Sequence, residues 1–536
     1  MTLTTMSTVR TTMRIRKTRA GAFVAAIAAS FVLLAGCGGG GPSGDDQASG
    51  PPQSGGTATY AVNGEISGTF DPAKLISISA TIADGHVGYL LYGGLVETNP
   101  VTQEVVPVMA KSLTSDNGTV WKLVLRDGLK FSDGTAFDAA AVKLNWERHA
   151  DPAVASGARG VATSIASLEV VDPVTLRITL KEVNFQFPRS VALFAVNWIA
   201  SPAAIQAGTL GDKPVGAGPF MLKDRQRDDH MTFVRNPNYF DAPRPYLDQV
   251  VLRPIADSTQ RLNSLTTGQI DGLLALKRND AAQAEKQGLQ VLTVNMSGGI
   301  SLYFNFTKPI PGDVRFRQAL RLAIDNTAIS ESVEQGNGTD TSAFFAPGTM
   351  FDDPASAWPK PDLAAAQKLI DEMAAERGGP VRFSFIVDQS NEAEANAVQT
   401  QLAALKNLQV DMQVLGPLQP TQRMIKGDFE VAVNSNFNLD PEPRIGLVLQ
   451  PGNARNYLRY DNPEMTAVMQ AGRATQDVEK RKEVYRKFDE IVNRDVPWVV
   501  LLRSNPNVIW DATKLKDVTV FEDGIIHWDR VWRSGT

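Results

Sequence analysis

Residues 362–433 decide the fold of this chain, and they read DLAAAQKLIDEMAAERGGPVRFSFIVDQSNEAEANAVQTQLAALKNLQVDMQVLGPLQPTQRMIKGDFEVAV. A helix is predicted to start after Asp362, whose carboxylate suits the N-cap position, and to stop at Gly378-Gly379-Pro380. Its apolar positions are Leu363, Ala366, Leu369, Ile370 and Met373. Because these positions share one helical face, we expect the helix to pack that face against a sheet.

Two more helices and three strands are predicted along the same stretch. The first strand shows alternating Val381, Phe383, Phe385 and Val387. The next helix carries Ala395, Val398, Leu402 and Leu405, and the second strand Leu408, Val410, Met412 and Val414. A short helix near 420–426 then leads to a strand at 429–433. This β-α-β-α-β order predicts a parallel sheet with right-handed crossovers. Ligands of such sheets bind beyond the carboxyl ends of strands, so the residues after Val433 are candidates for a binding site.

Length and composition are those of a soluble protein with more than one domain. The chain has 536 residues, of which 43% are hydrophobic and 21% charged. Two or three domains are expected, because single cores stop growing near ~300 residues. Five of the 53 Lys and Arg lie in residues 1–36, whereas all 58 Asp and Glu lie later. Without that leader the net charge is about −10, which argues against nucleic acid as a partner, since phosphate binding needs a basic face.

The N-terminus has the pattern of a secretory signal that ends at a lipid-modified cysteine. A basic segment to Arg19 precedes the apolar run AGAFVAAIAASFVLLAG at 20–36, which is short for a membrane span. The run ends in Leu34-Ala35-Gly36-Cys37, which resembles a lipobox, and Cys37 is the only cysteine. We expect residues 1–36 to be removed and Cys37 to carry acyl chains such as palmitate. The alternative is an ordinary secretory signal beside an incidental cysteine.

The residues after Cys37 predict a tether, and the rest of the chain lacks motifs for catalysis. Residues 37–56 hold no large apolar side chain and should form a flexible linker. A lipidated Cys37 leaves no thiol for a disulfide or a nucleophile. The histidines are scattered without metal-ligand spacing: His86, His149, His230 and His527. With no nucleophile elbow and no phosphate-binding loop in the sequence, no enzyme activity, cofactor or metal is expected.

Eight segments spread over the chain resemble family 5 of the extracellular solute-binding proteins, which includes oligopeptide-, dipeptide- and nickel-binding proteins. The most specific is WKLVLRDGLKFSDGT at 121–135, which is similar to the family signature W-x-F-x-L-R-x-x-x-x-F-x-D-G-T. The others are 70–73 (FDPA), 92–96 (YGGLV), 215–220 (VGAGPF), 235–240 (RNPNYF), 313–320 (DVRFRQAL) with 323–325 (AID), 460–464 (YDNPE) and 495–498 (DVPW). Most of these residues suit turns and packing, so they indicate the scaffold and not the binding site.

The resemblance implies an α/β, two-lobed periplasmic-binding-protein type II fold with an extra subdomain in the first lobe. Lobe I is expected to be discontinuous, at 57–96, 206–297 and 505–536, with the extra subdomain at 97–205. Lobe II is expected at 298–504. Two strands that cross between the lobes would form the hinge, and closure on a ligand would exclude water from the cleft.

The predicted binding site centres on residues 434–440, NSNFNLD. In oligopeptide-binding relatives the matching stretch is W-x-x-D, whose carboxylate pairs with the ligand's α-ammonium. The resemblance implies that Asp440 keeps this acid and that Phe437 replaces the Trp, with Asn436 and Asn438 beside them. An ammonium removed from water needs a charged partner. Asp440 is therefore expected to face the cleft, so that its loss lowers affinity and hardly affects folding. The alternative is that Asp440 only shapes the turn before Pro441.

Further candidates come from positions where relatives contact their ligands. Those in lobe I and at the lobe crossover are Ser77, Ile78, Ser79, Tyr303 and Asn305. Several oligopeptide binders have an aromatic residue near Leu418 and a basic one near Ile425, and this chain has neither. That difference argues against longer peptides and against the usual carboxylate anchor. Arg423 or Arg444 is the expected substitute.

The expected function is capture of a peptide or similar small solute and its delivery to an ABC permease. The protein should be a monomer, anchored through Cys37 at the extracytoplasmic face of the membrane, in the periplasmic space or at the cell surface. The same fold could instead take an oligosaccharide, an opine-like conjugate, haem or a nickel chelate, or it could act as a ligand-dependent sensor. An enzyme is disfavoured because no nucleophile and base are paired in any motif.

Overall fold

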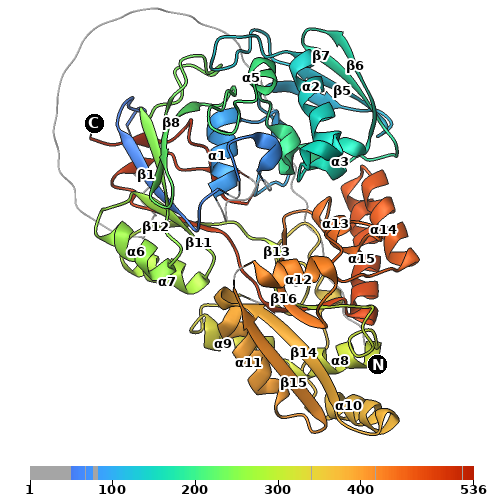
Figure 1. The fold of residues 1–536 in the computed structure, drawn as a ribbon. Helices are drawn as coiled ribbons and strands as arrows, with labels where there is room; N and C mark the ends of the chain where they lie inside the picture. The colour runs from blue at the N-terminus through green and yellow to red at the C-terminus, as the bar shows by residue number, and fades with distance from the viewer. Residues whose placement is uncertain are drawn as a thin grey trace, which may run out of the picture. The chain divides into compact units, whose positions relative to one another are not determined.

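Three β-sheets organise the part of the chain that the computed structural model describes (Figure 1). The described residues are 50–66, 68–75, 83–339, 341–416, 418–521 and 523–535. The predicted signal peptide, Cys37 and most of the predicted linker lie outside them, and so do Ser77, Ile78 and Ser79. The elements below all belong to the unit that runs from Pro51 to the C-terminus.

A seven-stranded sheet of order β12-β18-β11-β1-β10-β9-β8 collects strands from the start, middle and end of the chain. Its strands are β1 (Thr57–Val62), β8 (Phe220–Gln226), β9 (His230–Arg235), β10 (Gln249–Pro254), β11 (Gly272–Ala275), β12 (Gln290–Thr293) and β18 (Asn507–Trp510). The helices α1 (Ala83–Tyr92), α6 (Ser258–Thr266) and α7 (Arg278–Lys286) accompany it. We call this part lobe I. Strand β18, from near the C-terminus, lies between β11 and β12, so lobe I joins segments that are far apart in the sequence.

Short strand pairs complete lobe I. They are β2 (Val96–Thr98) with β3 (Val105–Pro107), β19 (Leu515–Lys516) with β22 (Trp532–Arg533), and β20 (Val520–Phe521) with β21 (Ile525–Ile526). The loop between β20 and β21 carries Asp523. That loop matters below because it reaches the other half of the molecule.

An antiparallel four-stranded sheet of order β4-β5-β7-β6 forms the extra subdomain. Its elements are β4 (Ala110–Thr114), β5 (Val120–Leu125), β6 (Ile165–Asp172) and β7 (Thr175–Leu180), with α2 (Ala139–Ala150), α3 (Arg159–Thr163), α4 (Phe187–Leu193) and α5 (Pro202–Ala207). The buried Trp146 of α2 donates its indole N–H to the Val196 carbonyl at 2.7 Å. The apolar core of this subdomain is continuous with that of lobe I, which makes it a part of that lobe.

A five-stranded sheet of order β15-β14-β16-β13-β17 forms the other half, lobe II. The strands are β13 (Ser297–Phe304), β14 (Val381–Asp388), β15 (Leu408–Leu415), β16 (Val431–Asn438) and β17 (Trp498–Leu502). The helices are α8 (Val314–Ala323), α9 (Asn326–Val333), α10 (Leu363–Arg377), α11 (Glu392–Leu402), α12 (Gln419–Lys426), α13 (Arg444–Leu449), α14 (Pro463–Ala474) and α15 (Val478–Asp495). Strand β14 runs parallel to β15 and β16, which confirms the parallel sheet predicted from residues 362–433.

Three details of that prediction differ from the structure. Leu363, assigned to the apolar helix face, is the first residue of α10 and is 47% exposed, whereas Ala366, Ile370 and Met373 of that face are buried. Leu405 lies after α11 ends, although its side chain is buried. Strand β16 continues past Val433 to Asn438, because β13 pairs with it along its whole length. Residues 434–438, which were predicted to follow the strand, therefore form its C-terminal part.

Two chain segments connect the sheets of the two lobes and run side by side. Residues 294–296 join β12 to β13, and residues 503–506 join β17 to β18. The Val294 N–H donates to the Pro506 carbonyl at 2.9 Å, and the Met296 N–H donates to Asn505 Oδ1 at 3.0 Å. This paired crossing has the form of the hinge that two-lobed binding proteins use for closure.

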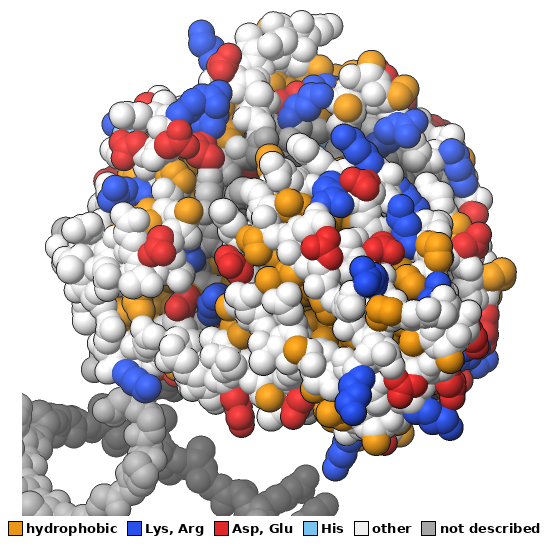
Figure 2. All heavy atoms as spheres, turned by 60° about the horizontal axis from the view of Figure 1, so that its bottom comes forward, with side chains coloured by type: hydrophobic (Ala, Val, Ile, Leu, Met, Phe, Trp, Pro, Cys, Tyr) orange, Lys and Arg blue, Asp and Glu red, His pale blue; other side chains and the backbone are white. Residues whose placement is uncertain are grey.

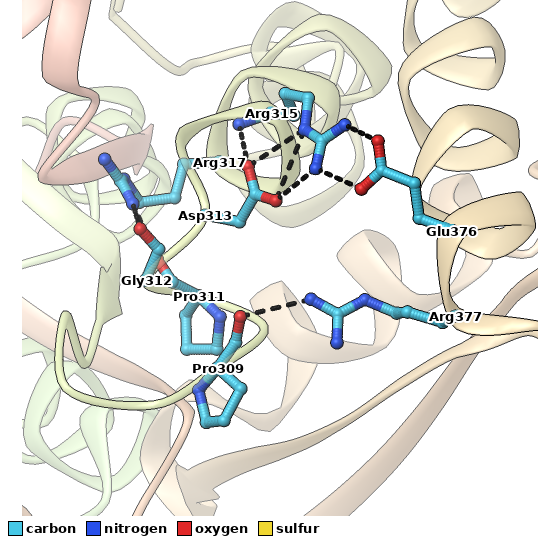
Figure 3. A network of polar contacts seen from close by, with 8 residues as sticks. All are labelled: Pro309, Pro311, Gly312, Asp313, Arg315, Arg317, Glu376 and Arg377. Carbon is cyan, nitrogen blue, oxygen red and sulfur yellow. Dashed lines mark hydrogen bonds and ion pairs between the residues drawn. The ribbon is translucent and has the colours of Figure 1, made fainter.

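The loop after β13 is held to the helices of lobe II by charged side chains (Figure 3). Asp313 caps α8 by accepting from the Arg315 N–H at 2.9 Å. The Arg315 guanidinium bridges Asp313 at 2.8 Å and Glu376 of α10 at 2.7 Å. Arg317 donates to the Pro311 carbonyl at 2.7 Å. These contacts give segment 313–320 a structural role, in keeping with its assignment to the scaffold.

The surface carries charges of both signs. Figure 2 shows Lys and Arg interspersed with Asp and Glu over the face that it presents, with hydrophobic side chains scattered among them. Among the described residues, no helix combines the length and the apolar character that a membrane crossing requires.

Candidate functional site

A cavity of about 190 Å³ lies where the two lobes, the extra subdomain and the crossing segments meet. The subdomain contributes Leu193 and Phe194, and lobe I contributes Leu276 and Asp523. The crossing segments contribute Met296, Ser504 and Pro506, and lobe II contributes Ser435, Asn436, Phe437, Arg444, Leu447, Val448 and Arg455. Because its walls come from every part of the fold, the cavity would open whenever the lobes separate.

The end of β16 is brought into this cavity by two glycines on β13. Gly298 pairs with Phe437 in the antiparallel ladder and has φ +79°. A Cβ at Gly298 would lie 1.8 Å from the Asn436 carbonyl oxygen, so only glycine permits this approach. A Cβ at Gly299 would lie 2.3 Å from the Leu502 carbonyl oxygen on the other side. The close strand packing fixes where Asn436 and Phe437 stand in the wall.

Asp440 lies beside the cavity, and its carboxylate already has cationic partners. Arg481 of α15 binds both of its oxygens, at 2.7 and 2.9 Å, and Arg189 of α4 approaches to 3.2 Å. The Glu442 N–H donates to the same carboxylate at 2.9 Å. Burial disfavours the ionised form, but Arg189 and Arg481 outweigh it and lower the pKa of Asp440. The expectation of a free, cleft-facing carboxylate with little part in folding is thus corrected, because two guanidiniums occupy it.

Two ion pairs join lobe II to lobe I and its subdomain across the cleft. Arg189 of the subdomain pairs with Asp440, and Arg444 of α13 pairs with Asp523 of the β20–β21 loop. The Phe185 N–H also donates to the Arg473 carbonyl at 2.8 Å. The lobes are therefore in direct contact, as in the closed state of a two-lobed binding protein.

Glu442 is the buried acid of this region without a close cationic partner. Its nearest guanidinium, that of Arg473, is 3.6 Å away, and its Oε1 has no hydrogen-bond partner. Burial, opposed by Arg473 and reinforced by Asp440, raises the pKa of Glu442 to about 7. Glu442 also lines a cavity of about 550 Å³ between the subdomain and lobe II, which shares Phe194 and Leu447 with the first cavity.

Like Asp523, Arg455 is a charged residue of the cavity wall that sequence reasoning missed. Its half-buried side chain lines the cavity near Arg444, and within the described part of the chain no carboxylate pairs with its guanidinium. The pKa of Arg455 is lowered, mainly because burial disfavours its charged form. Tyr457 opposes this shift, and the positive charge of Arg444 adds to it. No local motif marks this arginine, since its position in the wall depends on packing between distant segments.

Two buried polar atoms in the wall also lack partners among the described residues. They are Nδ2 of Asn436, whose residue is 6% exposed, and Oδ1 of Asp523, whose residue is 4% exposed. A buried donor or acceptor without a partner costs on the order of 1–3 kcal/mol. A bound solute that supplies both partners would recover that cost, so these atoms are suited to contact a ligand.

The predicted ligand residues fall into two groups. Asn436, Phe437 and Arg444 line the cavity, and their contact with a ligand stays a prediction. Asn438 is fully buried beside them, with both amide atoms unpartnered within the described residues. The remaining predicted residues lie outside the cavity wall: Tyr303, Asn305 and Arg423.

The residues outside the wall have structural surroundings instead. Tyr303 is 1% exposed and packs near Trp498 in the core of lobe II. Asn305 donates to the Phe429 carbonyl at 3.0 Å, which ties β13 to the start of β16. Arg423 of α12 pairs at 3.1 Å with Asp428, which follows the end of that helix. None of these contacts leaves the side chain pointing into the cavity. No cluster of three or more His, Cys, Asp or Glu that could hold a metal occurs among the described residues.

Two α/β lobes, a double crossing and a cavity between them define a solute-binding protein of the periplasmic type II fold. Residues 104–456, more than half of the chain, match the family described as bacterial extracellular solute-binding proteins, family 5 Middle. The chain belongs to this family, as its sequence motifs predicted. It is therefore a member of a transport family whose proteins act outside the cytoplasm.

Similar proteins of known name support the same fold. The glutathione-binding protein GsiB of Salmonella paratyphi A is 26% identical over 417 residues, which cover 74% of this chain and 80% of that protein. Among solved structures, the periplasmic binding protein DppA of Helicobacter pylori, in complex with a peptide, has a TM-score of 0.77 at 23% identity, covering 90% of this chain and 98% of that one. AgaA of Agrobacterium tumefaciens, in complex with agropinic acid, has a TM-score of 0.78 at 22% identity, covering 90% and 99%.

Proposed function

We propose that the mature protein captures a short peptide or a peptide-like solute in the interlobe cavity and delivers it to an ABC permease. The observation that carries this proposal is the unpartnered polar wall, in which Asn436, Arg455 and Asp523 face one small cavity from both lobes. A zwitterionic solute with amide groups would supply a partner to each of them. The names of the similar proteins, which bind glutathione or a peptide, point to the same class of ligand.

Closure would couple capture to delivery. Two ion pairs form only when the lobes meet: Asp440 with Arg189, and Arg444 with Asp523. Together with the ligand, they favour the closed state. A permease that recognises the closed lobes would then distinguish loaded from empty protein. We further propose that the chain is a monomer that binds solute without transforming it.

Lipid on Cys37 would keep the protein at the extracytoplasmic face of the membrane. The residues from Pro51 to Ser54 carry no helix or strand, and the Gly55 N–H donates to the Tyr246 carbonyl at 2.8 Å, where the folded unit begins. A tether between Cys37 and this point would hold the binding unit near a permease and raise its effective concentration there.

The test is capture of solute by the purified mature protein. Native mass spectrometry of protein isolated from its own cells should show a bound small molecule. Adding that molecule back should raise the melting temperature by mass action, with a Kd in the micromolar range or tighter, roughly −8 kcal/mol. The molecule should be recovered chemically unchanged. If no solute from a library of di- and tripeptides shifts the melting temperature, or if the protein turns solute over, the proposed function is wrong.

An opine-like conjugate is the second candidate. It is favoured by the fold of AgaA, whose solved structure contains agropinic acid, and by a cavity small enough for one compact solute. The same mass measurement separates the two, because peptides and opines differ in mass and in sensitivity to peptidases. Oligosaccharide, haem and nickel-chelate cargo, and a sensor role, would be distinguished by the same experiment.

A further inference from the structure

The cavity wall has more positive than negative charge. It contains two guanidiniums, those of Arg444 and Arg455, and one carboxylate, that of Asp523. Arg444 pairs with Asp523 and also donates to the Phe437 carbonyl at 2.9 Å. Arg455 remains without a carboxylate partner among the described residues. The folded chain outside this cavity has an acidic balance, so the excess positive charge is a local property of the site.

An unpaired guanidinium in a closing cleft has an energetic consequence. Removing a charge from water is costly unless a counter-charge with good geometry replaces the lost hydration. Arginine presents a planar fork of donors that matches a carboxylate with two parallel hydrogen bonds. Since no side chain of the described protein provides that carboxylate to Arg455, the ligand is the remaining source.

The rest of the wall defines the other end of the ligand. Asp523 Oδ1 is a buried acceptor with a negative charge and no hydrogen-bond partner, which suits an ammonium. Asn436 Nδ2 is a buried donor, which suits a peptide carbonyl. The wall has two guanidiniums and one carboxylate, so a ligand that places an ammonium at Asp523 balances the charge of the site when it brings two carboxylates.

We infer that the site selects a short peptide-like solute with one more carboxylate than ammonium groups, and that Arg455 determines this preference. The inference rests on the proposed function and names the class of solute within it. The cavity of about 190 Å³ is below the ~300–1,000 Å³ of ordinary small-molecule sites, which favours a di- or tripeptide over a longer chain.

The test compares peptides of similar size and different charge by isothermal titration calorimetry at pH 7.5. The series contains the cationic Ala-Lys and Ala-Gln amide, the neutral Ala-Ala, and the anionic Ala-Glu and glutathione. Wild-type protein should bind Ala-Glu and glutathione at least tenfold more tightly than Ala-Ala, and should bind Ala-Lys and Ala-Gln amide more weakly still. Ala-Gln amide is the shape-matched control for Ala-Glu, because it lacks both carboxylates.

Variants then identify the residue responsible. Arg455→Gln should weaken binding of Ala-Glu and glutathione by roughly 30-fold to more than a thousandfold, the cost of unpairing a buried charge. It should leave the weak binding of Ala-Gln amide nearly unchanged. Arg455→Lys, which keeps the charge and loses the planar fork, should restore part of the affinity. Arg486→Gln, an exposed arginine paired with Asp353 on the outside of lobe II, is the matched control and should bind all peptides like wild type.

The outcomes separate this inference from the proposed function. If Ala-Lys or Ala-Ala binds as tightly as Ala-Glu, the charge preference is wrong, although peptide capture stands. Equal weakening of every peptide by Arg455→Gln would also overturn the role of Arg455. If no solute of any charge binds the wild-type protein, the proposed function fails and the inference fails with it. Should Arg455→Gln not fold, the wild-type charge series and Arg455→Lys decide the question.

Discussion

Replacing Asp440 with asparagine should destabilise the folded protein, and not only weaken ligand binding. The Asp440 side chain is 3% exposed, and Arg481, which binds both of its oxygens, is 2% exposed. Asparagine keeps the shape of the residue but removes its charge and turns one acceptor into a donor that faces a guanidinium. Arg481 and Arg189 then remain in the interior without a counter-charge.

The size of the loss follows from that geometry. Removing one partner of a buried ion pair costs on the order of 3–5 kcal/mol, since the surviving charge is neither hydrated nor paired. An exposed pair contributes only ~0–1 kcal/mol. Asp428, whose side chain is 69% exposed and pairs with Arg423 at 3.1 Å, supplies the matched control. Asp428→Asn should therefore leave the free energy of unfolding within about 1 kcal/mol of wild type.

Urea unfolding at pH 7, followed by tryptophan fluorescence, measures both variants. The double variant Asp440→Asn/Arg481→Met should recover part of the loss, because replacing a buried pair with apolar side chains is often close to neutral. The guanidinium of Arg481 lies 5.1 Å from the ring of Phe351 and 5.5 Å from that of Tyr485, so methionine would have aromatic neighbours there. A positive coupling energy between the two sites would identify the pair as the cause.

Lowering the pH should diminish the difference in the free energy of unfolding between wild type and Asp440→Asn. The pKa of Asp440 is lowered on folding, so its contribution is fully present above the unfolded value of about 3.9 and is lost as pH falls through the folded pKa. The reasoning is refuted if Asp440→Asn is as stable as Asp428→Asn at pH 7. If affinity falls in that case while stability does not, the original prediction of a ligand-facing carboxylate would be the better account.

Two further predictions concern Glu442 and Cys37. The pKa of Glu442 is raised on folding from 4.5 to about 7, so the unfolded chain loses this proton at a lower pH than the folded chain does. The free energy of unfolding therefore falls as the pH rises between those two values. Glu442→Gln should therefore gain stability relative to wild type between pH 5 and pH 8, by up to roughly 3 kcal/mol at 1.36 kcal/mol per pKa unit, and a pH-independent difference would contradict the raised pKa. Cys37→Ala should move the protein from the membrane to the soluble fraction, and the lipid anchor is excluded if wild-type protein carries no lipid mass and the variant stays membrane-bound.

The helices and strands of residues 362–433 could be predicted because their signals are local. An N-cap at Asp362, a stop at Gly378 and alternating apolar residues in β14 each act within a few positions of the chain. The parallel order followed from the alternation of strands and helices. What that reasoning missed was the extension of β16 to Asn438, since the partner strand β13 lies more than a hundred residues earlier in the sequence.

The candidate site was predictable only as a region. The motif around Asp440 led to the end of β16, where Asn436, Phe437 and Arg444 line the cavity. The roles of single charges were not accessible, because each depends on partners from other segments. Asp440 meets Arg481 from 41 positions away, and Arg444 meets Asp523 from 79 positions away.

By itself, the sequence determined the fold family, the secondary structure of residues 362–433 in lobe II and the acidic balance that argues against nucleic acid as a partner. The fold family followed from the resemblance of local segments to a known family, and the other two properties depend on spacing and composition. The chain carries all of these signals whether or not it is folded. Only the tertiary structure decided which charges are neutralised and which are left for a ligand. No local sequence pattern distinguishes Arg481 from Arg455. In the folded protein Arg481 is buried and paired with Asp440, whereas Arg455 lines the cavity and has no carboxylate partner among the described residues. Electrostatic pairing falls off over a few ångströms, so it is a property of folded distances and not of the order of residues.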